Sequence, residues 1–132
     1  MTIPQIYTDG SCLKNPDGPS GWCFCVLENN KQWLVSGGYP SSTNNRMELI
    51  AVIEALEFVQ GLEYTIYTDS LLTLNCATGV WKRKANLDLW YYFDQNSMGK
   101  KLHWQWVKAH NGNKLNELVD HVAKKEAKLQ KK

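Results

Sequence analysis

The four residues Ile-Tyr-Thr-Asp occur twice in this chain of 132 residues, at positions 6–9 and 66–69. In each copy a β-prone segment leads into an aspartate, which is followed at once by a turn-forming glycine or serine. We interpret both copies as strands that end at an acid, with a helical pattern between them. If these strands are parallel neighbours, Asp9 and Asp69 lie side by side at the sheet edge where ligands gather in open α/β folds. Two unrelated aspartates that begin turns are the alternative.

Hydrophobic patterns place further strands and helices around this repeat. We expect strands over 3–9, 20–28, 31–39, 63–69 and 102–107, and helices over 43–60, 70–78, 86–98 and 115–129. The order βββαβααβα predicts an α/β fold, with a five-stranded mixed sheet flanked by helices on both faces. A chain of this length is expected to form a single domain over residues 1–132.

Charge is unevenly distributed along the chain. From residue 100 onward there are nine lysines against three acids, a net charge of +6, whereas residues 1–99 carry a net charge of −4. A basic end beside an acidic remainder favours a polyanionic partner, and a solvated lysine-rich helix is the alternative.

Neither a membrane nor a secretory pathway is indicated. No apolar run approaches the roughly 18 residues that cross a bilayer, and the first residues lack the basic and apolar parts of a leader. The cysteines form no C-x-x-C pair, and we expect free thiols in a cytoplasmic protein. They are Cys12, Cys23, Cys25 and Cys76.

Two further acids are predicted to lie near the repeated aspartates. Glu48 lies on the apolar stripe that the helix over 43–60 turns toward the sheet, although it also fits a capping box with Asn45. On the last helix, Asp120 flanks the core stripe and faces a cleft beside the sheet. An exposed acid that balances nearby lysines is the alternative there. We expect the core stripe of that helix to be Leu115, Leu118, Val119 and Val122.

Such a set of carboxylates, without a thiolate cluster, suits a hard cation such as Mg²⁺ or Mn²⁺. Two such ions, roughly 3.5–4 Å apart, can activate a water and stabilise the leaving oxygen of a phosphodiester. The pattern therefore favours a nuclease or a phosphoryl transferase. His110, in the polar loop before the last helix, can shuttle a proton near neutral pH, and a solvated loop histidine is the alternative.

A set of motifs spans residues 7 to 120. In chain order they are YTDGSC (7–12), NP (15–16), TNNRMEL (43–49), YTDS (67–70), WVKAH (106–110), NE (116–117) and the acid at 120. A lone D-G-S is a weak signal, whereas TNNRMEL, three correctly ordered acids and W-V-K-x-H together are highly specific. In this set the chain resembles type 1 ribonuclease H (ribonuclease HI) over nearly its whole length.

The resemblance implies a ribonuclease H-like fold and an endonuclease that cuts the RNA strand of an RNA–DNA hybrid, leaving 5′-phosphate and 3′-hydroxyl ends. It implies two Mg²⁺ ions, with Mn²⁺ able to substitute, and His110 assisting proton transfer or product departure. The implied ligands of the ions are Asp9, Glu48, Asp69 and Asp120.

The resemblance also implies substrate contacts. Thr43, at a helix N-terminus, would help to hold a phosphate of the DNA strand. Trp81 would line the DNA channel, unless it is a core residue that caps the short helix. The residues implied to approach the minor groove, where the RNA 2′-hydroxyl distinguishes the strands, are Cys12, Asn15, Asn44, Asn45 and Ser70.

The chain departs from the family pattern at one large feature and two small ones. Many bacterial members carry a basic protrusion between a tryptophan like Trp81 and an Asp-Leu-Trp segment, but here only residues 82–87 lie between them. The protrusion is thus largely missing, and we expect weak, salt-sensitive substrate binding through Lys82, Arg83 and Lys84. Leu71 stands where a polar residue is usual, and Ala109 where glycine is commoner.

Two other kinds of function are alternatives. The TNNRMEL helix start argues against a different nuclease or an integrase-like strand-transfer enzyme. A non-catalytic hybrid-binding module disagrees with four intact acids, because a −4 cluster repels a polyanion unless metal ions fill it. We therefore expect a catalytic monomer with an RNA–DNA hybrid as its partner, no membrane association and no obligate protein partner.

Overall fold

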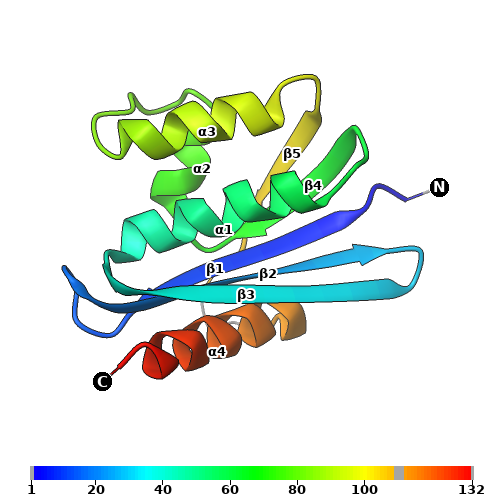
Figure 1. Cartoon of the computed structure of the whole chain (residues 1–132). Coiled ribbons are helices and arrows are strands. Elements are labelled where there is room, and N and C mark those ends of the chain that lie inside the picture. Colours follow the sequence, from blue (N-terminus) through cyan, green and yellow to red (C-terminus); the bar gives the residue numbers. More distant parts are fainter. Residues whose placement is uncertain (1, 109–111, 132) are drawn as a thin grey trace.

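The computed structural model describes residues 2–108 and 112–131 and is built on one five-stranded mixed sheet (Figure 1). Its strands are β1 (Gln5–Cys12), β2 (Gly18–Glu28), β3 (Lys31–Ser42), β4 (Glu63–Thr68) and β5 (Lys101–Trp106). Its helices are α1 (Asn44–Phe58), α2 (Leu71–Ala77), α3 (Leu87–Ser97) and α4 (Lys114–Leu129). The predicted order βββαβααβα is confirmed, with element boundaries within a few residues of those expected.

The repeated segments lie next to each other in the sheet. The strand order is β3-β2-β1-β4-β5, in which β1 pairs antiparallel with β2 and parallel with β4. Ile6 is in register with Ile66 and Tyr7 with Tyr67, so the two copies are aligned residue for residue. The two tyrosine rings stack with their centroids 4.4 Å apart. The parallel neighbours inferred from the sequence are therefore present.

The expectation that the first strand ends at Asp9 is wrong. The parallel ladder with β4 has its last pair at Tyr7 and Tyr67, but the antiparallel ladder with β2 continues until Cys12 pairs with Ser20. Asp9 therefore lies within β1, because a central strand continues for as long as one of its two neighbours supplies hydrogen bonds. Its side chain is carried on a rigid strand rather than on a turn.

Helices cover both faces of the sheet, as expected. Figure 1 shows α1 on one face, with α2 and α3 beyond it, and α4 on the other face. Because α3 packs on the outer side of α1, most of α1 is buried rather than one stripe. Its buried residues are Met47, Leu49, Ile50, Ala51, Val52, Ile53, Ala55 and Leu56.

The core stripe of α4 differs from the one predicted. The buried residues are Asn116, Val119, Ala123 and Ala127, while Leu115 and Val122 are only partly buried. Gly21 on β2 explains this rotation, because a Cβ atom there would overlap the backbone of Ala123 and Ala127. Small residues face each other at this contact, and the larger aliphatic side chains lie beside it.

Other expectations from composition can be compared with the structure. All four cysteines are free thiols, and Cys23 and Cys25 pack together under α4. Within residues 2–108 and 112–131, none of the helices combines the length and apolarity that a membrane span requires.

Candidate active site

Three acids meet where β1, α1 and the end of β4 come together. Carboxylate oxygens of Asp9, Glu48 and Asp69 all lie within 4.8 Å of one another. Asp9 is on β1, Asp69 follows the last residue of β4, and Glu48 is in the second turn of α1. The juxtaposition of the repeated aspartates, with Glu48 beside them, is therefore observed.

A glycine in the first motif lets Glu48 reach this position. A Cβ atom at Gly10 would overlap the backbone of Met47 and Glu48, so any other residue would push α1 away from β1. The Gly10 backbone N–H also donates to Asp9 Oδ1 at 2.8 Å. The glycine thus sets the approach of the helix and orients the first carboxylate.

The start of α1 leaves Glu48 free of a capping role. Thr43 is the N-cap, and its hydroxyl accepts a hydrogen bond from the Arg46 backbone N–H at 3.2 Å. The possible capping box between Asn45 and Glu48 is therefore wrong, because the helix begins two residues earlier than that motif requires.

Burial of the acids makes their charges unfavourable. Asp9 is only 2% exposed. Burial raises the pKa of Asp9 to about 7, and the nearby charge of Asp69 adds to the rise. Burial, followed by the charge of Asp9, raises the pKa of Glu48 well above its usual range.

The cluster has free acceptor atoms that suit a cation. Among the described residues, Asp9 Oδ2 and Glu48 Oε2 are buried without a hydrogen-bond partner. Buried carboxylate oxygens without donors are unfavourable unless a positive charge neutralises them. Oxygen ligands of this kind are the ones that Mg²⁺ and Mn²⁺ prefer. The residues present therefore fit a divalent cation.

Asp120 lies near this cluster without belonging to it. Its side chain is 23% exposed, and its Oδ2 is 3.1 Å from Lys124 Nζ, one turn further along α4. Its charge nevertheless contributes to the raised pKa of Asp9. Asp120 is thus close enough to act on the cluster, but its carboxylate pairs with a lysine.

Several of the implied substrate contacts lie around the same edge of the sheet. Asn15, in the β1–β2 loop, accepts a hydrogen bond from the Asn44 backbone N–H at 3.0 Å. Cys12 Sγ lies 3.4 Å from the Ser42 carbonyl oxygen. Ser70 is the N-cap of α2 and accepts from the Thr73 N–H at 3.1 Å. The contact between Asn15 and Asn44 joins the loop after β1 to the start of α1, while Asn45 remains exposed.

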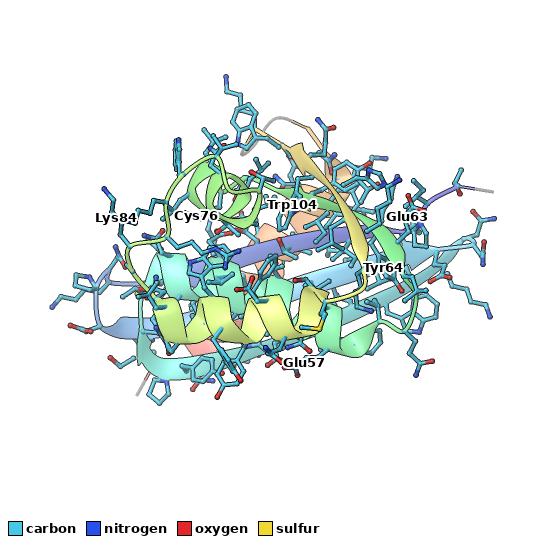
Figure 2. All side chains as sticks on the ribbon, turned by 90° about the horizontal axis from the view of Figure 1, so that it is seen from above. Glu57, Glu63, Tyr64, Cys76, Lys84 and Trp104 are labelled. Carbon is cyan, nitrogen blue, oxygen red and sulfur yellow. The ribbon has the colours of Figure 1, made fainter. Side chains whose placement is uncertain are left out.

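The basic segment after Trp81 divides into two kinds of residue. Trp81 is 47% exposed, so it is a surface residue rather than a core one. Lys82 and Lys84 are exposed, and Figure 2 shows Lys84 at the end of the molecule that also holds the loop following β1.

Arg83 points into the protein instead. Its guanidinium contacts both carboxylate oxygens of Asp94, the nearer at 2.8 Å, and its Cζ lies 4.3 Å from the centroid of the Trp90 ring. Its Nε also donates to the Cys76 carbonyl oxygen at 3.1 Å. These contacts commit its charge to the fold, which makes it a weaker candidate for phosphate binding than the two lysines.

Sequence analysis missed three features of this region. Gly10 and Asn116 appear there only as parts of motifs, whereas Gly10 sets the approach of α1 and Asn116 is a buried residue, 2% exposed. The pairing of Asp120 with Lys124 could have been predicted from the sequence, because residues four positions apart on a helix are neighbours. His110 lies outside the described residues.

Clustered carboxylates that suit divalent cations are a feature of nucleases, polymerases and phosphatases, which act on phosphate esters through two such ions. The RNase H family model matches residues 2–128 of this chain. Ribonuclease H of Neorickettsia sennetsu is 40% identical over 138 residues, covering 92% of this chain and 91% of that protein. Ribonuclease HI of Haemophilus ducreyi is 41% identical, covering 94% and 90%. The chain belongs to the ribonuclease H family.

Solved structures agree on the fold. The N-terminal RNase H domain of a Mycobacterium tuberculosis protein has a TM-score of 0.87 at 20% identity, covering 98% of this chain and 96% of that one. LC11-RNase H1, solved in complex with an RNA/DNA hybrid, has a TM-score of 0.76 at 23% identity, covering 92% and 97%.

Proposed function

We propose that the acidic cluster holds divalent cations and that this chain uses them to hydrolyse RNA paired with DNA. As a ribonuclease H, the chain is an endoribonuclease that cleaves the RNA strand of RNA–DNA hybrids. The observation that supports a metal-dependent mechanism is the set of three carboxylates whose oxygens lie within 4.8 Å of one another.

Asp9, Glu48 and Asp69 would hold the cations, with Asp120 as a fourth ligand. Divalent cations, when bound, polarise the scissile phosphate and the attacking water and offset the charge that develops on the leaving oxygen. We propose two Mg²⁺ ions, with Mn²⁺ able to substitute. The protein contributes the fixed positions of the carboxylates, which lie on a strand, at a strand end and on a helix held close by Gly10.

The hybrid would lie across the edge of the sheet that carries these acids. The bound hybrid in the LC11-RNase H1 structure supports this partner. Thr43, at the N-terminus of α1, would hold a phosphate of the DNA strand, and the exposed Trp81 would contact the same strand. Cys12, Asn15, Asn44, Asn45 and Ser70 would approach the minor groove.

The products would carry 5′-phosphate and 3′-hydroxyl ends. His110 would assist by moving a proton during product departure, because an imidazole changes protonation near neutral pH. We further propose that residues 1–132 form one catalytic domain that acts as a monomer in the cytoplasm. The free thiols support that location, since disulfides are rare there.

A cleavage assay tests this function against the two other functions. A hybrid labelled on each strand in turn is incubated with the protein, with and without Mg²⁺, and the ends of the products are analysed. We expect metal-dependent cuts in the RNA strand alone, with 5′-phosphates. Joined products would indicate strand transfer, and hybrid binding without cuts would indicate a binding module.

A further inference from the structure

The ion pair between Asp120 and Lys124 on α4 involves the carboxylate that is the fourth ligand of the proposed site. Asp120 Oδ2 and Lys124 Nζ are 3.1 Å apart, and the two residues are separated by four positions along the helix. An acid placed four residues before a lysine has the favourable orientation for such a pair. The Asp120 carboxylate therefore has a cationic partner before any metal ion arrives.

The same carboxylate lies beside the three clustered acids. Val119, the residue next to Asp120, is fully buried in the same core cluster as Cys23, which pairs with Asp9 in the sheet, so α4 holds Asp120 near Asp9. The charge of Asp120 acts on Asp9, yet Asp120 is not among the three acids whose oxygens lie within 4.8 Å of one another. Asp120 Oδ2, the oxygen that pairs with Lys124, cannot at the same time bind closely to a cation held by the other three acids, so the carboxylate has to turn from the lysine for both of its oxygens to face that cation.

We propose that Lys124 is a positioning residue that holds the Asp120 carboxylate away from the acidic cluster until a divalent cation displaces it. The inference rests on the proposed function, because it takes Asp120 as a ligand of that cation. Exposed ion pairs on helices are weak, and the Lys124 side chain is 48% exposed. The pair therefore breaks readily, and it lowers the affinity for the cation without preventing binding.

The sign of the effect follows from this competition. In the metal-free protein Lys124 stabilises Asp120, and that interaction is lost when the carboxylate turns to the cation. Replacing Lys124 with a neutral side chain removes this loss, so the cation binds more tightly. The size expected for an exposed pair of this kind is about two- to threefold in the dissociation constant.

The test measures cation affinity on the full chain. Mn²⁺ and Mg²⁺ are titrated by calorimetry into the wild type, Lys124→Met, Lys124→Arg and Lys125→Met, and the metal-dependent rise in Tm is followed in parallel. Lys125 is the matched control, because it is the adjacent exposed lysine on the same helix. We expect tighter binding in Lys124→Met, near-wild-type affinity in Lys124→Arg, and less than half of the Lys124→Met gain in Lys125→Met.

A double-mutant cycle separates positioning from a general effect of charge. In an Asp120→Asn background the Lys124→Met change should raise cation affinity no more than Lys125→Met does in the wild type, because the competing carboxylate is gone and only the general effect of charge is left. The Mg²⁺ concentration for half-maximal cleavage should fall in Lys124→Met with Asp120 present.

Three results would overturn the inference. They are unchanged or weaker binding in Lys124→Met, an equal gain in Lys125→Met, and an equal gain in the Asp120→Asn background. If the wild type neither binds a divalent cation nor cuts the hybrid, the proposed function fails and the inference fails with it. If the wild type does both and any of the three results is found, only the inference is wrong.

Discussion

Asp9 brings a carboxylate into a position that is 2% exposed, beside two other acids. A single buried charge in such a place is destabilising unless it is neutralised. At the residue scale, the site is therefore a compromise between stability without metal and readiness to bind a cation. Substitutions at Asp9 test both sides of this compromise.

We predict that Asp9→Asn abolishes cleavage and stabilises the metal-free protein. The amide keeps the shape of the side chain but removes the charge that burial and Asp69 make unfavourable. The expected gain in the free energy of unfolding is on the order of 1–2 kcal/mol in EDTA. Cleavage of labelled hybrid and urea unfolding measure the two effects. Retention of more than a few per cent of activity in Mg²⁺ would contradict the assignment of Asp9 as a ligand.

The raised pKa of Asp9 predicts how metal-free stability depends on pH. An acid whose pKa is higher in the folded state binds more protons there than in the unfolded chain, so the free energy of unfolding falls as pH rises through that interval. For Asp9 the interval runs from its usual value of about 4 to about 7, and Glu48 changes stability in the same direction. Urea unfolding in EDTA across this range should show the decline, with a shallower slope in Asp9→Asn. An equal slope in the two proteins would show that Asp9 does not cause it.

For His110 we predict slower turnover rather than loss of activity. A positioned proton-transfer group typically contributes about 10²–10⁴-fold, while the charged cluster supplies the remaining stabilisation. Single-turnover cleavage by His110→Ala across a pH series measures the effect. A loss as complete as that of Asp9→Asn would mean that His110 belongs to the essential site.

At the scale of elements, the site depends on how closely α1 approaches β1. The helix meets the strand at Gly10, where a side chain would overlap the helix backbone. On the opposite face of the sheet Gly21 has the same role, because a side chain there would overlap the backbone of α4. The sheet is thus held between two helices at contacts that tolerate only hydrogen in place of a side chain.

We predict that Gly10→Ala impairs metal binding more than it impairs folding. Overpacking of this kind typically destabilises a protein by about 1–3 kcal/mol, but moving α1 also displaces Glu48 from Asp9. The matched control is Gly37→Ala on β3, which overpacks the contact with the Trp22 ring and lies on none of the elements that carry the acids. Calorimetric titration of Mn²⁺ should show a larger loss of affinity for Gly10→Ala when the two variants are equally destabilised. Equal losses would indicate that helix approach at Gly10 does not set the site.

At the scale of the whole molecule, two groups of exposed lysines bear on substrate binding. One is the exposed pair Lys82 and Lys84 on the loop before α3, and Figure 2 shows Lys84 at the end of the molecule that also holds the loop following β1. The other lies on the outer face of α4 and at its C-terminal end, within the segment of net charge +6. In the absence of a basic protrusion, these lysines are the candidates for contacts with substrate phosphates.

Replacing Lys82 and Lys84 together with alanine should raise KM more than it lowers kcat, because such groups contact substrate and transition state alike. The logarithm of the association constant falls as the logarithm of salt concentration rises, and each lost phosphate contact makes this slope shallower by about 0.9. Hybrid affinity across a salt series measures this, with Lys125→Ala/Lys128→Ala as the variant of equal charge on α4. If only the α4 variant weakens binding, the C-terminal helix has the role of the protrusion.

Arg83→Ala provides a contrast within the same segment. Its guanidinium pairs with Asp94 and stacks on Trp90, so its loss should lower stability, by about 1 kcal/mol, with little change in the salt slope. If Arg83→Ala changes the slope as the two lysines do, then Arg83 also contacts substrate phosphate.

Much of this architecture follows from local patterns in the sequence. Alternating and helical periodicities determine where the strands and helices lie, and the repeated IYTD segments indicate which two strands are neighbours. The acids of the cluster could also be identified from the sequence. Asp9 and Asp69 each close a copy of the repeated segment, and Glu48 lies on the apolar stripe of the predicted helix. These features depend on the secondary-structure preferences of neighbouring residues and on the periodicity of apolar side chains along one face, and both can be read from a short stretch of sequence.

Other features were decided only by tertiary contacts. β1 continues past Asp9 because β2 pairs with it there, and the stripe of α4 rotates onto its alanines because Gly21 lies opposite. Arg83 turns inward because Asp94 and Trp90 are near. A sequence pattern gives each side chain a face, but its partner depends on which segments, distant in the chain, pack against that face.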